Sequence, residues 1–181
     1  MIASFLTDRS FLVGTKSFPE KTPFIRSYLE KGQLSGVTPQ SFQATCFLQK
    51  MDWQKTRECQ DQWWVLDRWG PSGTVYGYLD EAYETDFKDF MNYSDPNYRL
   101  LEKPAIGYIL VGKPDKILSR LSQRGEDASC YESKEKQLRL YDMFRMYAMK
   151  DPSYKLIDTT NLTLTDVFDI ITVDLVKTFS L

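Results

Sequence analysis

Two opposite charges follow a short apolar run near the middle of the chain. The run Trp63–Leu66 has the length and composition of a buried strand, and Asp67 and Arg68 come directly after it, followed by the Gly-Pro-Ser-Gly segment 70–73. Because sheet interiors do not tolerate charge, the pair predicts the mouth of a site at the carboxyl end of this strand. A structural ion pair between the two side chains is the alternative.

The other residue types restrict the chemistry of such a site. The chain has no histidine, which excludes Ser-His-Asp and Cys-His nucleophile systems and histidine-ligated metals. The three cysteines, Cys46, Cys59 and Cys130, are an odd number without C-x-x-C spacing, so neither a disulfide framework nor a zinc site is indicated. Any chemistry must therefore use carboxylates, Arg, Lys and bound ions.

Bulk composition is that of one soluble globular domain. The chain has 181 residues, of which 42% are hydrophobic and 27% charged. A net charge of -2 gives no general electrostatic case for binding nucleic acid or an anionic membrane. No apolar run approaches the roughly 20 residues of a membrane span, and the first nine residues lack a signal-peptide pattern. We expect a cytoplasmic protein, or an organellar one if a front segment is missing.

Apolar patterning predicts strands that alternate with helices. The predicted strands are 11–13, 63–66, 106–111 and 154–157, and a loop is predicted for 92–104. The predicted helices are 1–8, 22–31, 38–58, 72–91, 112–121, 133–148 and 167–176, and Ser133 is the predicted cap of the sixth. Strands that are apolar throughout favour an α/β fold with a parallel sheet covered on both faces.

Three loops are expected at carboxyl ends of these strands, where ligands bind in open parallel sheets. They are 17–22, 67–73 and 158–161. Together they supply Lys21, Asp67, Arg68 and Ser72, a combination suited to a phosphate and a metal ion.

The order of motifs resembles the thymidylate kinase family from residue 1 to the last helix. The motifs are SFPEKTP (17–23), DRWGPSG (67–73), RG (124–125), YE (131–132) and YKLID (154–158). FPE and DRW-x-x-SG are the most specific, and FPE looks more like the eukaryotic and viral branch. The resemblance implies a P-loop-kinase-like three-layer sandwich, one domain over 1–181 and a lid at about 124–132.

The resemblance also implies roles on the acceptor side. Phe18 would stack near the nucleotide base, Pro19 would shape its loop, and Lys21 would face the acceptor phosphate where the family uses Arg. Asp67 would position the acceptor phosphate and the water network of Mg²⁺, and Arg68 would neutralise phosphate charge during transfer.

Further residues are placed by the same resemblance. Ser72 and Gly73 would open the helix that lines the nucleoside pocket, and Tyr76 would face the sugar. Gln49 and Lys50 would contact base and phosphate, Arg124 would pack on the adenine of ATP, and Tyr131 would close the acceptor side. The plainer alternatives are core aromatics at Phe18 and Tyr76 and solvated surface charges at Lys21, Lys50 and Arg124.

The resemblance fails at the start of the chain. The family begins with a strand and a GxxxxGK[ST] phosphate loop, and no such motif occurs in these residues; residues 1–9 align best with the helix that follows the loop. We therefore expect the chain to lack one strand and that loop. The lid segment EDASC (126–130) is acidic and has Cys130 where an Arg is expected.

Three readings follow from this pattern. The first is a kinase that phosphorylates dTMP with ATP and Mg²⁺, impaired in the chain as given. The second is an inactive pseudokinase that binds a nucleotide or serves as a subunit of an assembly. The third is a kinase for another nucleotide. The resemblance also implies a homodimer through the helix predicted at 38–58. The stripe of Phe42, Cys46 and Phe47 on this helix allows it, and a buried intramolecular face explains the stripe equally well.

Overall fold

The computed structural model describes residues 11–14, 63–80, 86–93, 103–124 and 133–180. The chain divides into two compact units, one from residue 3 to 103 and one that includes residues 104–181, and each is described by itself. The helices predicted at 1–8, 22–31 and 38–58 lie outside the described residues. None of the described helices has both the length and the hydropathy needed to cross a membrane.

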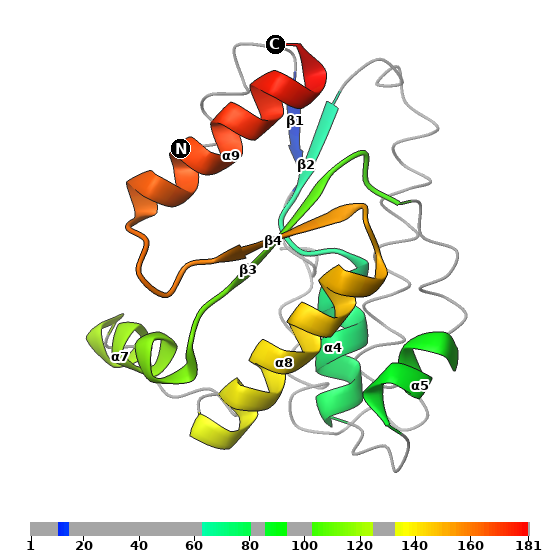
Figure 1. Ribbon diagram of the computed structural model, residues 1–181, viewed down its shortest axis with the longest axis vertical. Helices are drawn as coiled ribbons and strands as arrows, with labels where there is room; N and C mark the ends of the chain where they lie inside the picture. The colour runs from blue at the N-terminus through cyan, green and yellow to red at the C-terminus, as the bar shows by residue number, and fades with distance from the viewer. Residues whose placement is uncertain (1–10, 15–62, 81–85, 94–102, 125–132, 181) are drawn as a thin grey trace, which may run out of the picture. The chain divides into compact units, whose positions relative to one another are not determined.

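The first unit contains a parallel pair of strands followed by two helices (Figure 1). Its elements are β1 (Phe11–Gly14), β2 (Trp63–Leu66), α4 (Gly70–Asp80) and α5 (Phe87–Tyr93). Phe11 pairs with Trp63 and Gly14 with Leu66, so the two strands end level with each other. Both predicted strands are confirmed.

Helix α4 is held by apolar contacts rather than by helix propensity, since three of its first eight residues are glycines. Val75, Tyr78 and Leu79 are buried. The ring of Tyr78 lies 5.1 Å from that of Phe87 and 5.2 Å from that of Phe90, both on α5. These edge and tilted aromatic contacts fix the helix that follows the candidate site.

The prediction of one helix over 72–91 is wrong at Asp86. This residue is not helical, and its side-chain oxygen accepts a hydrogen bond from the backbone N–H of Lys88 at 2.7 Å. Asp86 therefore caps a new helix, α5, which runs through Tyr93 and so enters the segment predicted as a loop. At the other end, α4 begins at Gly70, two residues earlier than predicted.

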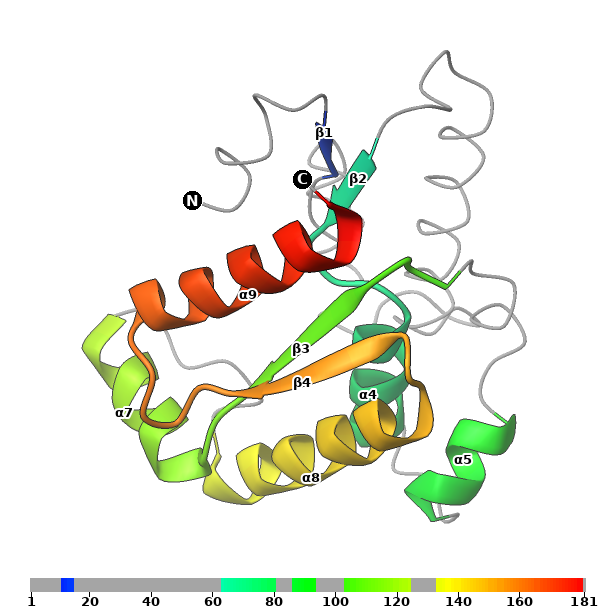
Figure 2. The same cartoon turned by 45° about the horizontal axis from the view of Figure 1, so that its top comes forward.

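The second unit is a parallel strand pair with helices on its two faces (Figure 2). Its elements are β3 (Gly107–Val111), α7 (Pro114–Arg124), α8 (Lys134–Lys150), β4 (Tyr154–Asp158) and α9 (Leu164–Phe179). Gly107 pairs with Tyr154 and Val111 with Asp158. The α/β class and the parallel pairing are thereby confirmed, and α7 runs three residues beyond its predicted end.

Alternate residues of β3 and β4 contact different helices. The Tyr154 ring meets Tyr147 of α8 edge-on at 5.6 Å, whereas the Tyr108 hydroxyl donates to Asp174 of α9 at 2.6 Å. Both Figure 1 and Figure 2 show α8 and α9 on opposite sides of the strand pair. The core between these layers comprises Ile109, Val111, Leu140, Met143, Ile157, Ile171 and Leu175.

Side-chain caps define where two helices of this unit begin. The Ser133 hydroxyl accepts from the backbone N–H of Lys136 at 3.2 Å, which confirms the predicted cap of α8. Thr163 and Asp166 form a reciprocal capping box at the start of α9. The cap of α9 fixes the turn that follows β4, at the carboxyl edge of the strand pair.

Candidate functional site

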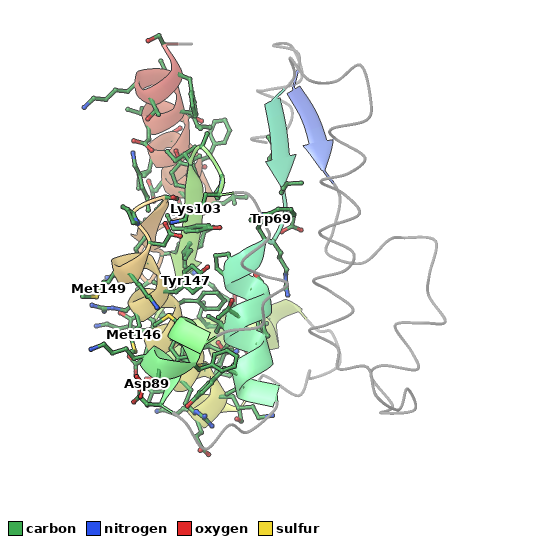
Figure 3. The ribbon with its side chains drawn as sticks, turned by 90° about the vertical axis from the view of Figure 1, so that its right-hand side faces the viewer. Trp69, Asp89, Lys103, Met146, Tyr147 and Met149 are labelled. Carbon is green, nitrogen blue, oxygen red and sulfur yellow. The ribbon has the colours of Figure 1, made fainter. Side chains whose placement is uncertain are left out.

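The turn from β2 to α4 presents the two predicted charges. Asp67 and Arg68 are exposed and come directly after Leu66. The carbonyl of Trp69, labelled at this turn in Figure 3, accepts from the N–H of Ser72 at 3.0 Å and from that of Gly73 at 3.5 Å. The first turn of α4 therefore closes on Trp69 and leaves both charged side chains on its outside.

Arg68 has an unusual backbone conformation for its residue type. Its φ is 69°, in the left-handed region that non-glycine residues rarely occupy. Such a conformation costs on the order of 1 kcal/mol or more, and in folded proteins it concentrates at functional turns. In this turn it lets the chain reverse between β2 and α4 while the Arg68 side chain stays at the strand end.

The Arg68 guanidinium lies over an aromatic ring of α4. Its central carbon is 5.4 Å from the centroid of the Tyr76 ring, which is half-buried. This distance is within the range of a cation–π interaction. The structure thus brings together two residues that the sequence placed in one site, and the ring orients the cation without neutralising it.

An ion pair between Asp67 and Arg68 is not observed. The salt bridges between described side chains are Lys134–Asp115 and Lys155–Asp174, so neither charge at the end of β2 has an ionic partner among the described residues. Within this part of the chain, the structural ion-pair alternative is not supported.

Strand register places a second chain segment at the same edge. Because Gly14 is level with Leu66, the chain leaves β1 at the edge where Asp67 emerges. The amino terminus of α4, with Ser72 half-buried and Gly73 buried in its first turn, is at this edge as well. Helix amino termini favour anions through their free N–H groups and dipole.

Several predicted site residues cannot be placed. Phe18, Pro19, Lys21, Gln49, Lys50 and Tyr131 lie outside the described residues, as does the predicted dimer helix 38–58. Arg124 is the last residue of α7, and its side chain also lies outside the described set. The structure therefore gathers Asp67, Arg68, Ser72, Gly73 and Tyr76, and the roles of all these residues stay predictions.

The third predicted loop, after β4, forms a hydrogen-bonded junction with the end of β3. The Thr160 hydroxyl accepts from the N–H of Lys113 at 2.9 Å, and the Thr159 hydroxyl donates to the carbonyl of Val111 at 2.9 Å. Hydrogen bonds from Thr160, first from its hydroxyl and then from its N–H, hold the pKa of Asp158 below its ordinary value. This carboxylate organises its own turn.

Arg120 is a residue of this junction that the sequence reasoning missed. Its guanidinium donates to the carbonyls of Thr159 at 2.8 Å and Leu162 at 3.2 Å, which ties α7 to the loop between β4 and α9. The available signal was its position three residues after Ile117, at the margin of the apolar face of α7. Arg120 has hydrogen-bond partners on another loop, whereas Arg68 lies against the Tyr76 ring at the carboxyl end of β2.

No preformed metal cluster is seen in the described ranges, where no three His, Cys, Asp or Glu side chains gather. Mg²⁺ in nucleotide enzymes is commonly held by one or two carboxylates together with substrate phosphates and waters. The single exposed carboxylate of Asp67 fits that kind of site. It does not fit a metal held by protein ligands alone.

Parallel strands flanked by helices, with charged groups at a strand end, define an α/β protein. Among solved structures, the chain is similar to thymidylate kinase from Candida albicans over 98% of this chain and 84% of that chain, with 18% sequence identity and a TM-score of 0.61. The fold is thymidylate-kinase-like, which confirms the predicted fold. No protein-family model and no curated protein sequence matches the chain.

Proposed function

We propose that the site at the carboxyl end of β2 binds a nucleoside monophosphate, with dTMP as the first candidate. The observation that supports it most directly is the exposed Arg68 guanidinium, oriented by Tyr76 and next to the free carboxylate of Asp67. A mononucleotide offers a dianionic phosphate for the cation and a sugar and base for the ring. The kinase-like fold adds weight to this choice.

The proposed reaction is transfer of the γ-phosphoryl group of ATP to dTMP, which yields dTDP for deoxynucleotide synthesis in the cytoplasm. Arg68 stabilises charge on the transferred group, and Asp67 positions the acceptor phosphate. Ser72 and Gly73, in the first turn of α4, lie beside the nucleoside, and Tyr76 faces the sugar.

The remaining predicted contacts belong to the same proposal. Phe18 and Pro19 form the base side, and Tyr131 closes the acceptor pocket. Lys21 and Lys50 face phosphate, and Gln49 faces the base. Arg124 faces the adenine of ATP.

Magnesium with ATP is the cofactor that this chemistry requires. Mg²⁺ neutralises the β- and γ-phosphates when bound, and Asp67 is the described residue that fits its water shell. A phosphate loop supplies the remaining donor contacts in such enzymes, but the 181 residues contain no GxxxxGK[ST] motif. We therefore expect slow turnover by this chain.

A nucleotide-binding pseudokinase is the second candidate, and the acidic lid segment 126–130 favours it. Lysines at positions 21 and 50 point the same way, because an ammonium group does not reproduce the bidentate contact of Arg with phosphate. This candidate shares the acceptor site with the first one. It differs only in whether phosphoryl transfer follows binding.

Calorimetric titration with dTMP, followed by an assay for dTDP, tests both candidates. We expect dTMP to bind, Arg68→Ala to weaken binding about tenfold or more, and Arg139→Ala, an exposed arginine of α8, to leave it unchanged. Formation of dTDP with ATP and Mg²⁺ supports the kinase. Binding without dTDP supports the pseudokinase.

The same titration with dUMP, dCMP and dGMP tests the choice of base. The Candida albicans enzyme is described as having a broad substrate specificity, so a panel is more informative than one nucleotide. If another monophosphate binds more tightly than dTMP, that nucleotide replaces dTMP as the proposed acceptor. If no monophosphate binds, both candidates are wrong.

A further inference from the structure

We draw no further inference here: the strongest candidate, the edge of β3 that faces away from β4 beside the half-exposed Leu110, carries nothing because nothing in the described part of the chain shows what covers it.

Discussion

The Arg68 guanidinium lies 5.4 Å from the centre of the Tyr76 ring, and the two residues come from different parts of one strand–turn–helix unit. Arg68 ends the turn after β2 with a φ of 69°, and Tyr76 lies in the second turn of α4. The start of α4 at Gly70 determines which helical residue faces the guanidinium. A ring at this position restricts a flexible cation while leaving its five N–H donors for a ligand.

Replacing Tyr76 tests whether this restriction matters for binding. Tyr76→Leu removes the ring and Tyr76→Phe keeps it. Because an exposed cation–π contact contributes about 0.5–1 kcal/mol, we expect Tyr76→Leu to weaken dTMP binding about two- to fivefold relative to Tyr76→Phe in calorimetric titrations. Equal affinities of the two variants would show that the ring does not orient Arg68.

A methyl group at Gly107 would clash with an aromatic ring. A Cβ built there lies 2.6 Å from one ring carbon of Tyr154 and closer still to another, and this ring in turn packs on Tyr147. We expect Gly107→Ala to lower the free energy of unfolding by about 1–3 kcal/mol, measured by urea titration. In a Tyr154→Leu background the same change should have a smaller effect, and an undiminished loss would mean that the ring is not the obstacle.

Two methionines of α8 form a matched pair for the core. Met143 is 5% exposed, whereas Met149 is 84% exposed. Met143→Ala leaves a cavity and should lower the free energy of unfolding by about 2–5 kcal/mol, while Met149→Ala should change it by less than about 0.5 kcal/mol. Thermal unfolding of both variants checks this, and a similar loss from the two changes would contradict the packing of α8.

Asp174 connects three elements of the second unit and confers a pH dependence. Its carboxylate accepts from Lys155 at 2.6 Å and 2.8 Å and from Tyr108 at 2.6 Å. These hydrogen bonds, that of Lys155 first, lower the pKa of Asp174. Burial raises the pKa of Tyr108, so its hydroxyl remains a donor across the neutral range.

The folded chain therefore binds a proton at Asp174 less readily than the unfolded chain. The stabilisation is present above the unfolded pKa of about 4 and is lost as the pH falls through the lower folded pKa. We expect Asp174→Asn to lower the free energy of unfolding by about 1 kcal/mol at pH 7 and by less near pH 3. The loss at pH 7 is small because Lys155 is half exposed and solvent screens the ion pair. Urea titrations at both pH values measure this, with the exposed Asp142→Asn as control; a difference independent of pH would contradict it.

Strand positions could be predicted because the apolar runs have sharp ends. Trp63–Leu66 is bounded by Asp67, and the predicted strand matches β2 residue for residue. The break at Asp86 was missed because the segment around it contains neither Gly nor Pro, and the aromatic residues continue on both sides. The capping hydrogen bond to Lys88 decides that boundary, and apolar periodicity does not report it.

Site geometry was harder to predict than the elements. The sequence indicated Asp67, Arg68 and Tyr76 separately, but their relation depends on the left-handed backbone of Arg68, which no residue-type rule assigns to an arginine. Arg120 was missed because its partners, Thr159 and Leu162, are about 40 residues away, and two of its three hydrogen bonds go to their backbone carbonyls. Backbone acceptors have no sequence signature, so a contact of this kind becomes visible only once the loop is folded.

The alternation of contacts along β3 and β4 has one consequence for folding. Tyr108 and Lys155 reach Asp174 on one side of the strand pair, and Tyr154 and Asp158 reach Tyr147 and Tyr141 on the other. Slippage of β4 by a single residue would exchange its two sides and break both sets of contacts together, and slippage of β3 would turn Tyr108 away from Asp174. Contacts with α9 on one side and with α8 on the other therefore each favour the observed register. A misaligned strand pair would make neither set of contacts.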